Sequence, residues 1–141
     1  MALLAAIGIL AGASIAYEIL LTRLFSILLW HHFAYMIISV ALLGIGASGT
    51  FLAFAREMLT PRFTETFAGC AMLFAASAIG GFALGQRVRF NPLEVIWDPA
   101  QQLHLAQIYG LLALPFFAVG TAIGLAFIVY ENRIAAIYRA V

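Results

Sequence analysis

Apolar residues fill four long stretches of the chain, and few charged side chains interrupt them. A helix needs about 20 such residues to cross the hydrocarbon core of a bilayer. The stretches that reach this length are 2–30, 32–54, 61–86 and 99–130. Because lipid offers the backbone no hydrogen-bond partners, each stretch must satisfy its own, which a helix does. The pattern predicts an all-α fold, a polytopic membrane bundle of about four transmembrane helices in one domain, 1–141.

Prolines and capping residues mark the expected connections. Thr60 before Pro61 predicts an N-cap and a first-turn proline for the third helix. Asn91, Pro92 and Glu94 form the pattern of a capping box, which predicts a short interfacial helical turn before the fourth helix.

The fourth helix is expected to begin at Pro99. Pro115 lies in its middle and has no N–H to donate, so a kink is expected there. Residues 131–141 are expected to be a tail or the start of a further segment.

Composition agrees with a lipid environment and argues against nucleic acid as a partner. Hydrophobic residues make up 65% of the 141 residues and charged residues 9%, with a mean hydropathy of +1.08. Seven arginines stand against six acidic residues, and a net charge of +1 is too small to attract nucleic acid. The single cysteine, Cys70, lies in an apolar run and is interpreted as a packing residue. The expected partners are the lipid bilayer and other membrane helices, from a continuation of the chain, a homo-oligomer or a larger complex.

Arginine placement predicts the orientation in the membrane. In a bundle of four crossings, the hairpin between the second and third helices shares a side with the tail. That side holds Arg56, Arg62, Arg133 and Arg139, against Arg87 and Arg89 on the other. The excess favours an integral membrane protein with both termini in the cytoplasm.

Small residues spaced by four occur in every predicted span. Without a hydrophobic drive between helices in lipid, such pairs let backbones approach and gain dispersion contact. The pairs are Gly8 with Gly12, Gly44 with Ser48, Gly81 with Gly85, and Gly120 with Gly124. They predict tight helix association, within the chain or with a partner.

The segment GIGASG, residues 44–49, matches the dinucleotide-binding pattern G-x-G-x-x-G. That chemistry requires a preceding strand and a water-accessible helix N-terminus. Since 44–49 lies inside a predicted span, we interpret it as helix packing.

Glu18 and Arg23 are the two charged residues inside the first span. A charge at the bilayer centre costs about 2.5–3.5 kcal/mol on insertion scales, so such side chains are paired or face inward. Five residues correspond to about 140° around a helix, which is poor for an ion pair within it. At least one is expected to find a partner on another helix or to reach the interface. A proton or substrate relay is the functional alternative.

His31 and His32 follow the first span. Adjacent histidines on a helix point about 100° apart and chelate a metal poorly. No Ser-His-Asp set, carboxylate pair or phosphate loop is recognisable in the connections. We therefore expect no catalytic residues, no cofactor and no metal site in this chain.

Two stretches resemble a known family. YEILLTRLFSILLWHHFAYMIISVALLGIGASGTFLA resembles the first two membrane helices of the spermidine-synthase-like integral membrane proteins of bacteria. FNPLEVIWDPAQQLHLAQIYGLLALPFFAVGTAIGLAF resembles the segment leading into their fourth helix. The tail RIAAIYRAV is similar to their entry into a further helix, but Arg139 and Ala140 follow Tyr138 where the family has an alanine-aspartate pair.

The resemblance implies a bacterial inner-membrane location. Relatives continue into further membrane helices and a soluble Rossmann-like domain resembling aminopropyltransferases, which would bind decarboxylated S-adenosylmethionine and a polyamine. The chain would then be an N-terminal fragment, a truncated relative or a portion of something longer. The matching positions belong to the membrane part: Tyr17, Glu18, Arg23, His32, Gly44, Gly46 and Gly49.

Three hypotheses follow from the sequence. The first is a non-catalytic membrane-anchoring and assembly module resembling the N-terminal part of the spermidine-synthase-like proteins. The second is a small accessory subunit of a larger respiratory or photosynthetic membrane complex. The third is a transporter or proton-path fragment that uses Glu18, Arg23 and His32.

Overall fold

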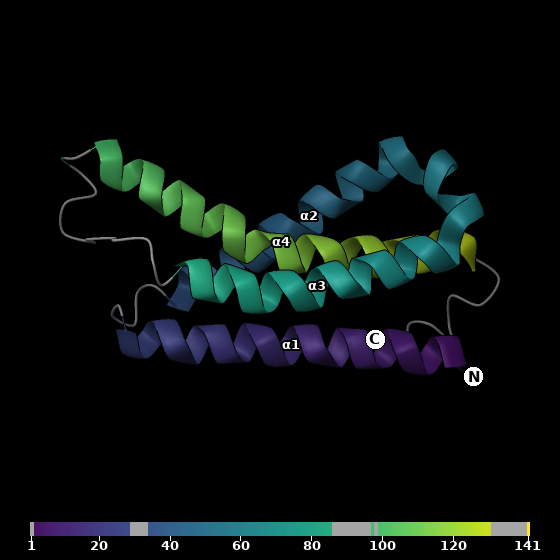
Figure 1. Cartoon of the computed structure of the whole chain (residues 1–141), viewed down its shortest axis with the longest axis horizontal. Helices are drawn as coiled ribbons and strands as arrows, with labels where there is room; N and C mark the ends of the chain where they lie inside the picture. Colours follow the sequence, from purple (N-terminus) through teal and green to yellow (C-terminus); the bar gives the residue numbers. More distant parts are fainter. Residues whose placement is uncertain (1, 29–33, 86–96, 98, 131–140) are drawn as a thin grey trace.

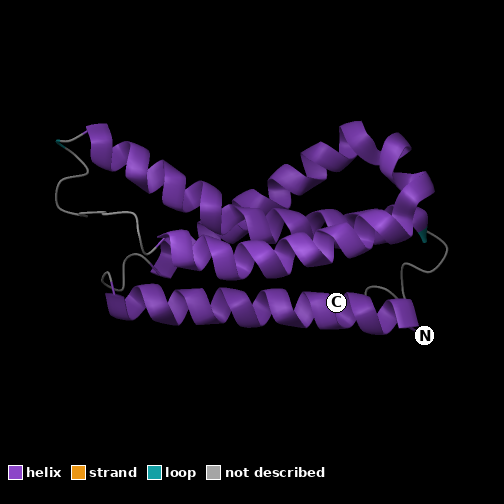
Figure 2. Ribbon diagram, in the orientation of Figure 1, coloured by secondary structure: helices purple, strands orange, loops and turns teal. Residues whose placement is uncertain are grey.

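The computed structural model describes residues 2–28, 34–85, 97, 99–130 and 141. These residues are almost entirely helical, without any strand, so the all-α prediction is confirmed for them (Figure 2). The helices are α1 (Ala2–Leu28), α2 (Ala34–Leu59), the short 3-10 helix η2 (Thr60–Arg62), α3 (Phe63–Gly85) and α4 (Pro99–Val129). The helical turn expected at 91–94 lies outside the described residues.

Three segments of the described chain are long and apolar enough to cross a membrane: Leu3–Ile27, Tyr35–Gly81 and Pro99–Val129. The second consists of most of α2 and α3, joined through η2. Figure 1 shows that the chain turns back at η2, so α2 and α3 run in opposite directions. Helices with the length and hydropathy to cross a membrane are thus present, as the sequence predicts.

The helix α4 is the centre of the bundle. Within an apolar window of 18 residues, 50% of the residues of α4 are buried. The corresponding fraction in α1 is 17%. Helices α2 and α3 pack along α4, whereas α1 lies beside them and has fewer buried residues (Figure 1). Since α4 contacts all the other helices, it holds the arrangement together.

Helices that follow one another along the chain alternate in direction, so that α2 and α4, which pack together, are parallel. Ile7 of α1 packs against Ala126 near the end of α4, whereas Leu21 packs near Leu112, so α1 and α4 are antiparallel. Helix α2 runs parallel to α4, because Gly44 lies at Phe116 and Leu52 at Gly124. Each helix therefore runs from one end of the bundle toward the other (Figure 1).

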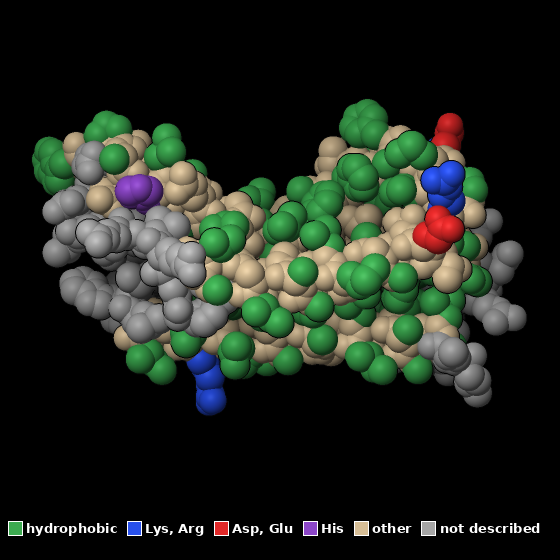
Figure 3. Space-filling model, in the orientation of Figure 1, with side chains coloured by type: hydrophobic (Ala, Val, Ile, Leu, Met, Phe, Trp, Pro, Cys, Tyr) green, Lys and Arg blue, Asp and Glu red, His purple; other side chains and the backbone are tan. Residues whose placement is uncertain are grey.

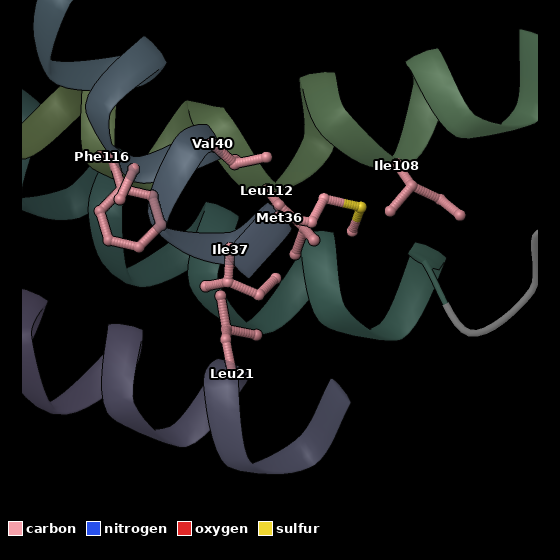
Figure 4. Packing of buried hydrophobic residues seen from close by; sticks show 8 residues of the cluster. Leu21, Met36, Ile37, Val40, Ile108, Leu112 and Phe116 are labelled. Atoms are coloured by element: carbon pink, nitrogen blue, oxygen red, sulfur yellow. The ribbon is translucent and has the colours of Figure 1, made fainter. Parts of the chain in front are cut away.

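The largest buried cluster joins α1, α2 and α4. Figure 4 shows Leu21 of α1 pointing toward Ile37 of α2, with Leu112 and Phe116 of α4 nearby. All four side chains are at most 1% exposed. Leu112 and Phe116 are four residues apart and therefore lie on the same side of α4, which faces the other two helices.

Helix α4 bends where the sequence places Pro115. Figure 1 shows that the axis of α4 changes direction near its middle, and Pro115 is buried there. Without an N–H, Pro115 leaves the carbonyl of Leu111 without its usual donor. Gly81 of α3 lies against this carbonyl, since a Cβ added at Gly81 would be 2.9 Å from the Leu111 oxygen. The proline of α4 and the glycine of α3 thus form one close contact, where a Cα–H can approach the free carbonyl.

The capping prediction for the third helix is wrong. The Thr60 hydroxyl donates to the Arg56 carbonyl at 2.6 Å, which lies one turn back in α2, and η2 has no side-chain cap. Pro61 lies within η2, and α3 begins only at Phe63. Thr60 therefore satisfies the end of α2 and not the beginning of α3, because a threonine hydroxyl can bond back to the carbonyl four residues earlier.

Candidate functional site

The closest helix contact in the described chain is the crossing of α2 and α4, built from small residues. A Cβ added at Gly44 would lie 2.5 Å from the Ala113 carbonyl oxygen and 2.8 Å from the Phe116 Cβ. One turn further, a Cβ at Gly120 would collide with the Ser48 hydroxyl. Backbones can come this close only where side chains are missing or small. Two of the sequence pairs, Gly44 with Ser48 and Gly120 with Gly124, therefore face each other.

The other small residues differ in their surroundings. Gly81 contacts α4, whereas a Cβ at Gly12 would have nothing within 4 Å. Gly8 is half-buried on α1. The surroundings of Gly85 lie outside the described part of the chain. A stripe of small residues in the sequence thus marks helix contacts on α2, α3 and α4, while on α1 it faces partly outward.

The GIGASG segment lies in the middle of α2. A helical turn, not a strand, precedes it, and Gly44 faces α4. Around Gly46 and Gly49, a Cβ would have nothing within 4 Å. The geometry is that of a helix crossing and offers no helix N-terminus to a phosphate.

Glu18 and Arg23 differ in depth and in environment. Glu18 is half-buried and lies about 24 Å from the start of α1 and about 15 Å from its end at 1.5 Å per residue. Arg23 is exposed and lies about 7.5 Å from the end of α1. Neither forms an ion pair with another described side chain. A long arginine side chain can reach the interface from there, whereas the carboxylate of Glu18 is too deep.

Glu18 lines a groove between α1, α2 and α4 with a volume of about 470 Å³. Ser14 lies one turn before it on α1, and Ser48 of α2 and Gly120 of α4 line the opposite side. The remaining wall is apolar and includes Ile15, Ile45, Leu52, Val119 and Ile123. The groove is the most promising site in the described chain because it combines a cavity with an unpaired carboxylate.

Tyr17 of α1 contacts two further helices, a structural role that the sequence pattern did not predict. Its hydroxyl donates to the Ala78 carbonyl of α3 at 3.3 Å. Its ring contacts Phe74 of α3 edge-on, with 6.0 Å between centroids, and Phe116 of α4 at 5.8 Å. The position of this tyrosine in the middle of a predicted span could have indicated an interhelical contact, because a buried hydroxyl requires a hydrogen-bond partner.

Replacing Tyr17 by phenylalanine should remove the bond to Ala78 while keeping both ring contacts. Hydrogen bonds between membrane helices contribute about 0.6 kcal/mol on average. We expect a loss of about that size in the unfolding free energy, measured by titrating mixed micelles with sodium dodecyl sulfate. Tyr35→Phe is the control, because Tyr35 is 72% exposed at the start of α2. An equal loss in both variants would contradict the role of the Ala78 contact.

The expectations for the histidines and for a metal site can be compared with the structure only in part. His31 and His32 are not among the described residues. In the described part, no three His, Cys, Asp or Glu side chains gather in a group that could hold a metal ion. Cys70 is half-buried beside the cluster that contains Phe74 and Ala118.

No protein-family model, no curated protein sequence and no solved structure matches this chain. Inferences about its function therefore rest on the geometry and chemistry of its own residues.

Proposed function

We propose that this chain is a non-catalytic membrane-anchoring and assembly module that crosses the membrane four times. The main support for this proposal is the set of three long apolar segments, of which the second folds back on itself at η2. Its 47 residues would span about 70 Å as one straight helix, more than twice the roughly 30 Å of hydrocarbon. Separate crossings by α2 and α3 fit both the length and the turn.

The charges support the hairpin as a membrane-surface element. Of the six acidic and basic side chains in the described residues, four lie at or beside η2 and are exposed: Arg56, Glu57, Arg62 and Glu65. Figure 3 shows acidic and basic side chains close together at one end of a largely apolar surface. Headgroups and water can solvate these charges, whereas hydrocarbon cannot.

The proposed orientation places this hairpin and both termini in the cytoplasm of a bacterium. We expect a cysteine introduced at Thr60, in a Cys70→Ser background, to react with an impermeant maleimide only after the inner membrane is opened. A cysteine introduced at Trp97, the exposed residue before α4, should react in intact spheroplasts. Labelling of both positions from one side would contradict separate crossings of α2 and α3.

The assembly role is supported by the exposed outer surface of α1. Large apolar side chains on its outer face, including Ile9, Ile19 and Leu20, are 57–73% exposed, beyond what α2, α3 and α4 cover. Close beside them, Gly12 leaves room for another backbone. Further membrane helices, from a continuation of the chain, a second copy or a larger respiratory or photosynthetic complex, would pack there.

Mild-detergent purification with in-membrane crosslinking tests the assembly role. We expect a particle larger than one 15.2 kDa chain, and Gly12→Leu should reduce its yield. A chain that always migrates alone at its own mass would contradict the assembly role.

The link to spermidine-synthase-like proteins rests on sequence resemblance alone. We infer from it that a longer parent protein carries an aminopropyltransferase-like domain. Reading the coding sequence beyond position 141 tests this link. A parent protein without any synthase-like domain would remove it and leave the anchoring role intact.

A further inference from the structure

The groove beside Glu18 has the size of a small-molecule site. Ligand pockets usually enclose about 300–1,000 Å³, and this groove has about 470 Å³. It is bounded by α1 on one side and by α2 and α4 on the other, next to the point where α2 and α4 cross, and Val141 also lines it. A membrane-spanning helix of a partner protein is too large to fit in a groove of this volume.

The polar side chains of the groove present acceptors. The Ser14 hydroxyl donates to the Ala11 carbonyl at 2.8 Å, and the Ser48 hydroxyl donates to the Ile45 carbonyl at 2.6 Å. Each serine proton is thus engaged within its own helix, while the serine oxygen keeps lone pairs. The carboxylate of Glu18 adds two acceptor oxygens. Among the described residues that line the groove there is no Lys or Arg, so for an occupant with a negative head these residues offer repulsion and no cationic donor.

We propose that the groove binds a hydrophobic primary amine, with its ammonium group on Glu18 and its apolar chain along α2 and α4. A protonated primary amine has three N–H donors, which match the acceptors of Glu18, Ser14 and Ser48. The apolar wall formed by Ile45, Leu52, Val119 and other residues would take up the hydrocarbon chain. Because Glu18 is remote from both ends of α1, water at the membrane surface does not reach its carboxylate, and the ammonium would be its partner.

The proposal depends on insertion of α1 into the membrane but not on the assembly role. Chain retained in membranes after alkaline extraction, yet unable to bind an amine, would refute the groove proposal alone. Chain released by alkaline extraction would refute the anchoring role instead.

The test is native mass spectrometry of the full chain in detergent, titrated with dodecylamine. Dodecan-1-ol has the same chain length without a charge, and butylamine has the charge without a long chain. We expect one bound dodecylamine per chain, with weaker adducts of both other probes. Glu18→Gln should weaken dodecylamine binding by about ten- to a hundredfold, because a charge-assisted hydrogen bond is lost.

Two further variants separate binding from folding. Glu57→Gln removes an exposed carboxylate near η2, outside the groove, and should leave binding unchanged. Ser14→Ala removes one acceptor and should weaken binding by about threefold. Equal binding of dodecylamine and dodecan-1-ol would overturn the proposal and indicate that the groove only holds lipid chains. So would unchanged binding in Glu18→Gln, provided that this variant unfolds at the same detergent concentration as the natural chain.

Discussion

Gly44→Ala is expected to destabilise the bundle by about 3 kcal/mol, at the upper end of the usual cost of overpacking. The added methyl group would lie 2.5 Å from the Ala113 carbonyl oxygen and 3.0 Å from the Phe117 nitrogen, which are backbone atoms of α4. A backbone cannot turn aside as a flexible side chain can, so α2 and α4 must separate. Their separation would also loosen the contact of Ser48 with Gly120 one turn away. The measurement is the free energy of unfolding in mixed micelles titrated with sodium dodecyl sulfate.

Gly46→Ala is the matched control. It makes the same change two residues along the same helix, where a Cβ would have nothing within 4 Å. Both variants gain the same helix propensity, up to about 1 kcal/mol in water, so their difference isolates the contact with α4. Similar stability of the two variants would show that the α2–α4 crossing is not as close as the structure has it.

Phe116→Ala is expected to cost about 2–3 kcal/mol. The Phe116 ring is 1% exposed and contacts both Tyr17 and the cluster formed with Ile37 and Leu112. Lipid is as apolar as the bundle interior, so the cost arises from lost packing and not from transfer to water. A residual cavity costs about 24 cal/mol per Å³, and the substitution removes on the order of 100 Å³.

The control for Phe116 is Phe54→Ala on α2. Phe54 is 86% exposed to the surroundings of the bundle, so its loss should change the unfolding free energy by less than about 0.5 kcal/mol. Both variants can be followed by the same detergent titration. Equal effects at the two positions would mean that Phe116 does not occupy the centre of the bundle.

The positions of the helices could be predicted from the sequence because lipid imposes a simple requirement. Every backbone group must be bonded within its own segment, so length and hydropathy predict helices at 2–30 and 99–130. The structure has α1 at Ala2–Leu28 and α4 at Pro99–Val129. The end of α2 was harder to predict: the helix continues to Leu59, since helix can extend past the hydrocarbon into the interface.

The partners of individual residues could not be predicted in this way. The pattern of small residues indicated that Gly44 and Gly81 lie at helix contacts, but not which helix each one meets. Nor did the sequence relate Gly81 to Pro115, although the carbonyl freed by Pro115 is the one that Gly81 approaches. Such pairings depend on how whole helices cross. A periodic sequence pattern shows only which face of a helix carries small residues.

The sequence by itself was sufficient to predict a lipid environment, the positions of the long helices and the two charged residues in the first of them. Hydropathy and length are local properties, and they suffice for these conclusions. Only the tertiary structure decided that α4 is central, that Tyr17 bonds to α3, and that Glu18 faces a groove while Arg23 faces outward. In lipid, helices associate through close packing and hydrogen bonds between their surfaces. These contacts depend on the arrangement of all the helices and cannot be read from one segment alone.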